Sequence, residues 1–151
     1  FRTMDDLFLA VVRRGAAQNL ERQAKALESP QPLRALWRLN TDPAGVTFAT
    51  ELFALANHRK AIRAELAQHA EVYRAMQRDA LAKLFAGFGV DIGDVPPVML
   101  AVFLTGLSQI LVLEETLGMS AGHEELRAFV ESWIARYEPA RRRRSPGASD
   151  S

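Results

Sequence analysis

Clusters of turn-forming residues divide this chain into segments that all have the apolar spacing of α-helices. The clusters are SPQP, NTDP and GFGVDIGDVPP, at residues 29–32, 40–43 and 87–97. Proline and glycine at such positions end or interrupt helices. Between the clusters, apolar residues recur every three or four positions, and no segment of useful length alternates with a period of two. We therefore predict an all-α fold, a helical bundle of about six helices.

Residue types at the segment ends match the preferences of helix termini. Thr3, followed by two acids, has the features of an N-cap, and Asp42 before Pro43 has the same features. Gly118 is expected to end the apolar helix and Ser120 to cap the last one. The expected helices cover approximately residues 4–28, 33–39, 44–57, 59–85, 97–117 and 121–137.

Length and composition restrict the classes of protein to consider. The chain has 151 residues, enough for one domain, and a net charge of +1, so total charge does not indicate nucleic-acid or membrane binding. It has no cysteine, which excludes disulfides, thiolate metal sites and a cysteine nucleophile and fits a cytoplasmic location. We expect one domain over 1–137 and a disordered basic tail over 138–151, whose arginines at 141–144 are most simply solvated.

The strongest apolar run covers residues 98–113. Its 16 residues are fewer than the roughly 20 of a membrane span, and Thr105 and Ser108 interrupt it. We therefore predict a buried helix and no membrane association. Because the run is apolar on more than one face, it must be covered on more than one side. A second copy of the chain is the expected cover.

The last helix carries a strip of large side chains just before the tail. Aromatic residues in this position suit an oligomer interface. We expect a homodimer through the last two helices, and the alternative that both helices pack inside the monomer remains open. The predicted interface residues are Leu104, Gly106, Leu107, Leu111, Phe129, Trp133 and Tyr137.

The opening stretch, FRTMDDLFLAVVRR, resembles the junction between the DNA-binding and regulatory domains of TetR-type transcriptional regulators. In that family an aromatic residue ends the DNA-reading segment and is followed by a Ser or Thr cap, acids and an apolar helix. Phe1, Thr3 and Leu7 match the aromatic, the cap and the first core residue of the connecting helix. The family commonly has a lysine after the cap, where this chain has Met4.

Two further segments are similar to the same family. Residues 38–76 look like its regulatory domains, and LAVFLTGLSQILVLEETLG resembles its dimer-forming helix, with the small Gly106 in the middle. The resemblance implies that residues 1–28 form the connecting helix, that Thr3 lies near DNA, and that a helix-turn-helix domain precedes Phe1. It also implies a homodimeric, cytoplasmic, non-enzymatic bacterial regulator without a cofactor, in which a small, largely apolar effector releases operator DNA, in most members relieving repression.

Candidate pocket residues come from an apolar stripe on the long fourth helix. His69 and Tyr73 are the polar members of this stripe, and they are either a hydrogen-bonding pair in an effector cavity or core residues bonded to the backbone. Glu51 is more simply explained as part of a solvated face. The predicted ligand-binding residues are Trp37, Phe48, Leu52, Leu66, His69, Tyr73, Met76 and Phe103.

Metal and enzyme functions have weaker support in the sequence. Glu65 and His69 lie four residues apart, but His58 is too far along a straight helix to join them, and no HExxH motif is present, so we predict no metal site. No glycine-rich phosphate loop or nucleophile set is recognisable. A helical-bundle enzyme or small-molecule carrier using the same cavity is the main alternative, and a dimerisation module without a cavity is a further one.

Overall fold

The computed structural model describes residues 3–89 and 95–138, and in these ranges every regular element is an α-helix. The prediction of an all-α fold is therefore confirmed. The six helices are α1 (Met4–Leu27), α2 (Pro32–Asn40), α3 (Pro43–Ala56), α4 (Lys60–Gly87), α5 (Pro97–Thr116) and α6 (His123–Tyr137).

Local sequence explains most of the helix ends. Thr3 forms a capping box with Asp6, because its Oγ1 accepts from the Asp6 amide at 3.1 Å and Asp6 Oδ2 accepts from the Thr3 amide at 3.0 Å. The Asp42 carboxylate accepts from the Gly45 amide at 3.2 Å, as a cap on α3 should. The expectation for Ser120 is wrong, since α6 begins later and its N-cap is Gly122 in the left-handed region, with φ +80°.

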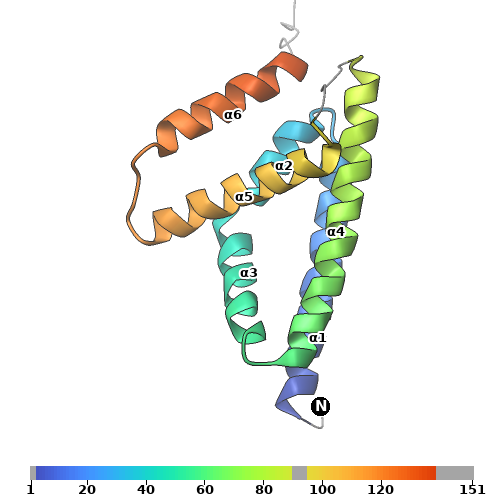
Figure 1. Cartoon of the computed structure of the whole chain (residues 1–151), viewed down its shortest axis with the longest axis vertical. Coiled ribbons are helices and arrows are strands. Elements are labelled where there is room, and N and C mark those ends of the chain that lie inside the picture. The colour runs from blue at the N-terminus through green and yellow to red at the C-terminus, as the bar shows by residue number, and fades with distance from the viewer. Residues whose placement is uncertain (1–2, 90–94, 139–151) are drawn as a thin grey trace, which may run out of the picture.

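The long helix α4 connects the two ends of the molecule (Figure 1). It runs beside α1 over much of its length, while α3 leans against it at the end that carries the N-terminus. At the opposite end α2 and α5 cross near α4, and α6 lies beyond them. We call these the narrow end and the wide end.

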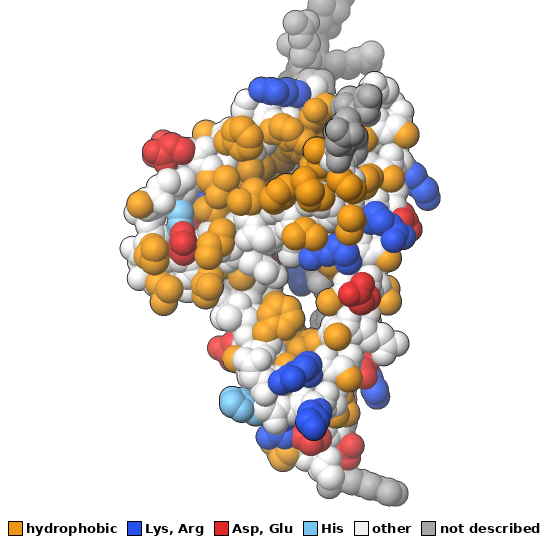
Figure 2. Space-filling view, viewed as in Figure 1, with side chains coloured by type: hydrophobic (Ala, Val, Ile, Leu, Met, Phe, Trp, Pro, Cys, Tyr) orange, Lys and Arg blue, Asp and Glu red, His pale blue; other side chains and the backbone are white. Residues whose placement is uncertain are grey.

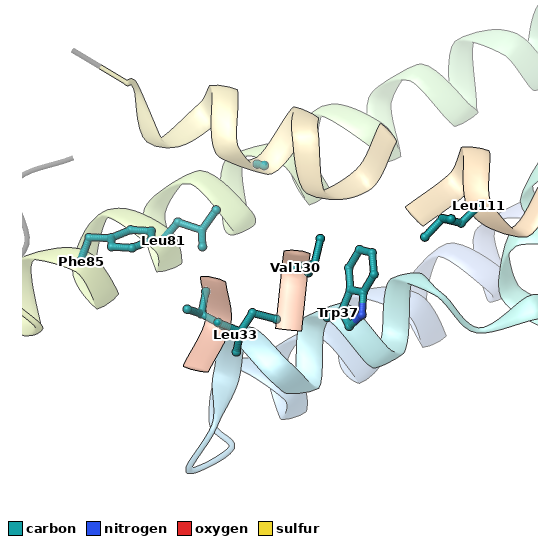
Figure 3. Packing of buried hydrophobic residues seen from close by; sticks show 8 residues of the cluster. Leu33, Trp37, Leu81, Phe85, Leu111 and Val130 are labelled. Carbon is teal, nitrogen blue, oxygen red and sulfur yellow. The ribbon is translucent and has the colours of Figure 1, made fainter. Parts of the chain in front are cut away.

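Each end has its own hydrophobic cluster. At the wide end, hydrophobic side chains from α2, α4, α5 and α6 pack into one cluster (Figure 3). Phe85 is central to it, because its ring lies 5.4 Å from that of Tyr137 and 6.0 Å from that of Trp133. The buried members are Leu33, Trp37, Leu81, Phe85, Ala101, Leu111, Val130 and Ile134. At the narrow end the buried cluster consists, among the described residues, of Val12, Ala56 and Ile62.

The end of α6 is attached to the start of α2 by a buried carboxylate. Glu138 is 5% exposed and accepts from the backbone amides of Leu33 at 2.6 Å and Arg34 at 3.1 Å. These amides belong to the first turn of α2, where unpaired N–H groups and the helix dipole favour a negative charge. The folded domain therefore extends through Glu138, which we had expected to begin the tail. The remainder of that predicted tail lies outside the described residues.

Helix α5 is not buried within a single chain. Only 22% of its most apolar 18-residue stretch is buried by the rest of the chain, so the expectation of a buried helix does not hold for the monomer. Its helical length of 20 residues also exceeds the apolar run seen in the sequence, and by length and composition alone it could cross a membrane. One such helix is weak evidence for a span, because core helices of soluble proteins have the same properties.

Candidate functional site: an apolar cavity with a polar side

A cavity of about 250 Å³ lies between α1, α2, α3, α4 and α5, on the narrow-end side of α5. Most of its lining is apolar, as in ligand pockets of other proteins. The lining residues are Val12, Gly15, Ala16, Asn19, Leu20, Arg22, Leu39, Asn40, Gly45, Val46, Phe48, Ala49, Leu52, Phe53, Leu66, His69, Ala70, Tyr73, Arg74, Thr105 and Gln109.

At the cavity wall, Gly15 of α1 faces the aromatic ring of Phe48 of α3. A Cβ atom on Gly15 would stand 2.9 Å from the Phe48 ring, closer than real contacts allow. Glycine at this position therefore lets the ring lie against α1. Phe48 and Phe53 both remain substantially exposed, so α3 covers the cavity without sealing it.

A hydrogen-bonded chain of three side chains from α1, α2 and α4 borders the cavity. The Tyr73 hydroxyl donates to Asn40 Oδ1 at 2.7 Å and accepts from Gln23 Nε2. Burial raises the pKa of Tyr73 to about 12, so the hydroxyl stays protonated at physiological pH. Asn40 Nδ2 and Gln23 Oε1 are buried and have no protein partner within the described residues. Among the described residues, the chain thus leaves an unused donor on Asn40, which lines the cavity, and an unused acceptor on Gln23, which does not.

The charged lining residues are cationic, and no carboxylate lines the cavity in the part of the chain that the structure describes. Arg22 lies 3.8 Å from Asp42. Arg74 is half-buried and donates a long hydrogen bond, 3.5 Å, to Thr105 Oγ1. Thr105 Oγ1 donates its own hydrogen bond to the Ala101 carbonyl oxygen at 2.8 Å. The lining therefore contains two arginines and no carboxylate among the described residues.

His69 reaches the cavity rim together with an acid. Its Nε2 lies 3.2 Å from Glu65 Oε1, and the same carboxylate accepts two hydrogen bonds from Arg13, at 2.9 and 3.0 Å. The hydrogen bonds from Arg13 hold the pKa of Glu65 below its usual value. Within the described residues, no group of three His, Cys, Asp or Glu side chains lies close enough to hold a metal ion. Glu65 and His69 thus form a hydrogen-bonded pair at the rim.

The structure brings together five of the eight residues predicted to bind a ligand. Phe48, Leu52, Leu66, His69 and Tyr73 line the cavity. Trp37 is instead part of the wide-end cluster, Met76 lies further along α4 away from the cavity lining, and Phe103 is 54% exposed on α5. Thr105 and Gln109 take the expected place of Phe103, because residues two apart on a helix point in nearly opposite directions.

Sequence reasoning missed the most polar lining residues. Asn40 is the last residue of α2 and lies in the NTDP motif, which from the sequence we interpret only as a turn. Arg74 is of a residue type that ordinarily lies on the surface. Arg74 directly follows Tyr73 in the sequence, and both residues line the cavity because the cavity wall extends around α4. The sequence signal for Arg74 is its position four residues after Ala70, because this spacing places both residues on the same face of α4.

The predicted interface residues divide into two groups on the structure. Leu111 is buried in the wide-end cluster, where Leu104, Leu107, Trp133 and Tyr137 also pack, so these side chains contact their own chain. Gly106 and Phe129 are exposed. The exposed apolar residues of α5 form an outward stripe, and Figure 2 shows hydrophobic side chains gathered over α5 and α6. We call the exposed set the apolar face: Val98, Met99, Val102, Phe103, Ile110, Leu113 and Phe129.

Comparison with known proteins adds no assignment. No protein-family model, no curated protein and no solved structure matches this chain.

Proposed function

We propose that this chain is the effector-binding and dimerisation part of a ligand-responsive transcriptional regulator of the TetR type. The observation that carries the proposal is the position of the cavity against α1. Val12, Gly15 and Ala16 of this helix line the cavity, and Thr3 caps the same helix at the narrow end. A ligand in the cavity would therefore touch the helix that, in a TetR-type protein, continues from the DNA-binding domain.

The coupling follows from differential binding. A ligand shifts the position of α1 only if it binds one position of that helix more tightly than the other. Contacts between α1 and α4 hold the helix in the described position, among them the Arg13–Glu65 pair and the stacking of the Arg59 guanidinium 4.9 Å from the Phe8 ring. The narrow end buries few side chains, so moving α1 there costs little packing energy.

The apolar face supports the dimer in this proposal. Its side chains are 38–66% exposed, and exposed apolar side chains gathered in this way are a feature of interaction surfaces. A second copy placed there would bury the outward stripe of α5 and Phe129. Two DNA-binding domains would then be held at a fixed spacing, as operator half-sites require.

The reading frame upstream of the Phe1 codon tests the family assignment. We expect it to encode a three-helix DNA-binding domain that ends in an aromatic-rich recognition helix. A start codon directly before Phe1, or an unrelated domain there, would contradict the proposal. With the DNA-binding domain present, gel-shift titration of the full-length protein on the DNA beside its own gene should show binding that a cavity ligand weakens.

The alternative of an enzyme on the same cavity has one observation in its favour. Glu65 is hydrogen-bonded to His69 at the rim, an arrangement that can orient a general base. Incubating the protein with a bound ligand and recovering it distinguishes the two functions. A regulator returns the ligand unchanged, whereas chemical conversion that is lost in His69→Gln would establish the enzyme.

A further inference from the structure

The Arg74 guanidinium is a positive charge without a protein counter-charge. It is half-buried on the cavity wall and forms no ion pair among residues 3–89 and 95–138. The hydrogen bond to Thr105 at 3.5 Å is a weak one by its length. Four of the five donors of the guanidinium are left for another partner.

The acids nearest to the cavity are already used by other groups. Asp42 caps α3 through the Gly45 amide and faces Arg22, and Glu65 accepts from Arg13 and His69. Neither carboxylate forms an ion pair with Arg74. A half-buried cation beside apolar side chains is costly unless an anion accompanies it.

Uncharged donors lie on the same side of the cavity. Asn40 Nδ2 is a buried donor with no partner, and Asn40 lines the cavity with Tyr73 and Arg74. The opposite walls, from α1 and α3, offer Val12, Val46 and Leu52. An occupant that satisfies both sides has an apolar body and a head with lone pairs and negative charge.

We infer that the cavity selects an amphipathic carboxylate, with the carboxylate against Arg74 and Asn40 and the apolar part between α1 and α3. This inference rests on the proposed function and names its class of effector. A carboxylate matches the planar fork of a guanidinium, and its single charge balances Arg74, the one arginine of the described cavity lining that forms no ion pair, whereas a phosphate dianion would exceed that charge.

The test compares acids with alcohols of equal length. We expect calorimetric titration of the intact chain to show octanoate or decanoate binding at least about tenfold more tightly than octanol or decanol. Arg74→Gln should remove most of this preference while the alcohols still bind. Arg78→Gln is the matched control, because Arg78 lies one turn further along α4, is exposed and pairs with Asp79.

Each other outcome has a definite meaning. Equal binding of acids and alcohols by the unmodified chain, or a preference that persists in Arg74→Gln, would overturn the carboxylate and leave the cavity and the proposed function in place. Binding of none of the four compounds would contradict the cavity as a ligand site, and with it both proposals. If Arg74→Gln does not fold, Arg74→Lys should still weaken the acid preference, because lysine keeps the charge but loses the fork.

Discussion

The two ends of α4 pack against different kinds of interior. At the wide end, Phe85 lies among the rings of Phe88, Trp133 and Tyr137, and helices from four parts of the chain close around it. At the narrow end, three small or medium side chains form the buried cluster and a cavity occupies much of the remaining space. One end of the helix supplies rigidity and a platform for α5 and α6, and the other supplies room for a ligand.

This difference indicates which end of α4 stabilises the fold and which end can respond to a ligand. A dense cluster resists movement because every displacement opens voids. A cavity bordered by half-buried polar groups is easier to rearrange, because water or a ligand can replace protein contacts. The following substitutions test this division, from the largest expected effect to the smallest.

The same Phe→Ala change at both ends measures the contrast directly. Phe85→Ala is expected to lower the free energy of unfolding by about 3–5 kcal/mol, because Phe85 is 1% exposed and its removal leaves a cavity. Phe8→Ala removes a half-buried ring that stacks with Arg59, and should cost less than half as much. Denaturant titration monitored by circular dichroism gives both values. Equal losses would mean that the narrow end is packed as tightly as the wide end.

At the wide end, the Glu138 carboxylate attaches the end of α6 to the start of α2 through hydrogen bonds. Glu138→Gln should lower the free energy of unfolding by about 1–3 kcal/mol, since one amide of α2 loses a charge-assisted partner. Glu125→Gln, an exposed change on the same helix, is the control. Urea midpoints compare the two variants. A loss no larger than that of the control would show that α2 is capped equally well without the charge.

The apolar face is tested by a substitution that the monomer itself tolerates. A Cβ on Gly106 would meet no atom of the described residues within 4 Å, so Gly106→Leu should leave the fold of the single chain intact and not destabilise it. In the proposed dimer it should raise the dissociation constant at least about tenfold. Analytical ultracentrifugation measures the constant. An unchanged constant, or a chain that is monomeric from the start, would remove this part of α5 from the interface.

The ion pair of Glu65 with Arg13 at the narrow end is expected to give the smallest effect, a dependence of stability on pH. Because hydrogen bonds from Arg13 lower the pKa of Glu65 in the folded chain, the pair stabilises the fold above the usual pKa of a glutamate. That contribution is lost as the pH falls through the lowered pKa. The melting temperatures of the unmodified chain and Glu65→Gln should therefore differ at neutral pH and converge in acid. A difference that persists at the acid end would assign the stabilisation to packing instead.

Local sequence determined the helices and most of their ends. Thr3 and Asp42 act through hydrogen bonds to amides three residues away, so their effect is visible without knowledge of the fold. The wall of α4 from Leu66 to Tyr73 was also predictable, because residues on one helical face share their surroundings. Helical spacing identified two stripes on α5 as well, but it could not indicate which of them turns inward.

Tertiary structure decided the remaining features. The crossing of α5 over α4 selects the stripe of Leu104 and Leu111 for the chain's own core and leaves that of Phe103 outside. The same crossing brings Thr105 to Arg74, while the return of α6 brings Glu138 to Leu33, 105 positions away in the sequence. Spacing along a helix fixes which residues share a face. The face that is buried, and the charge that is left without a partner, depend on where the other helices lie.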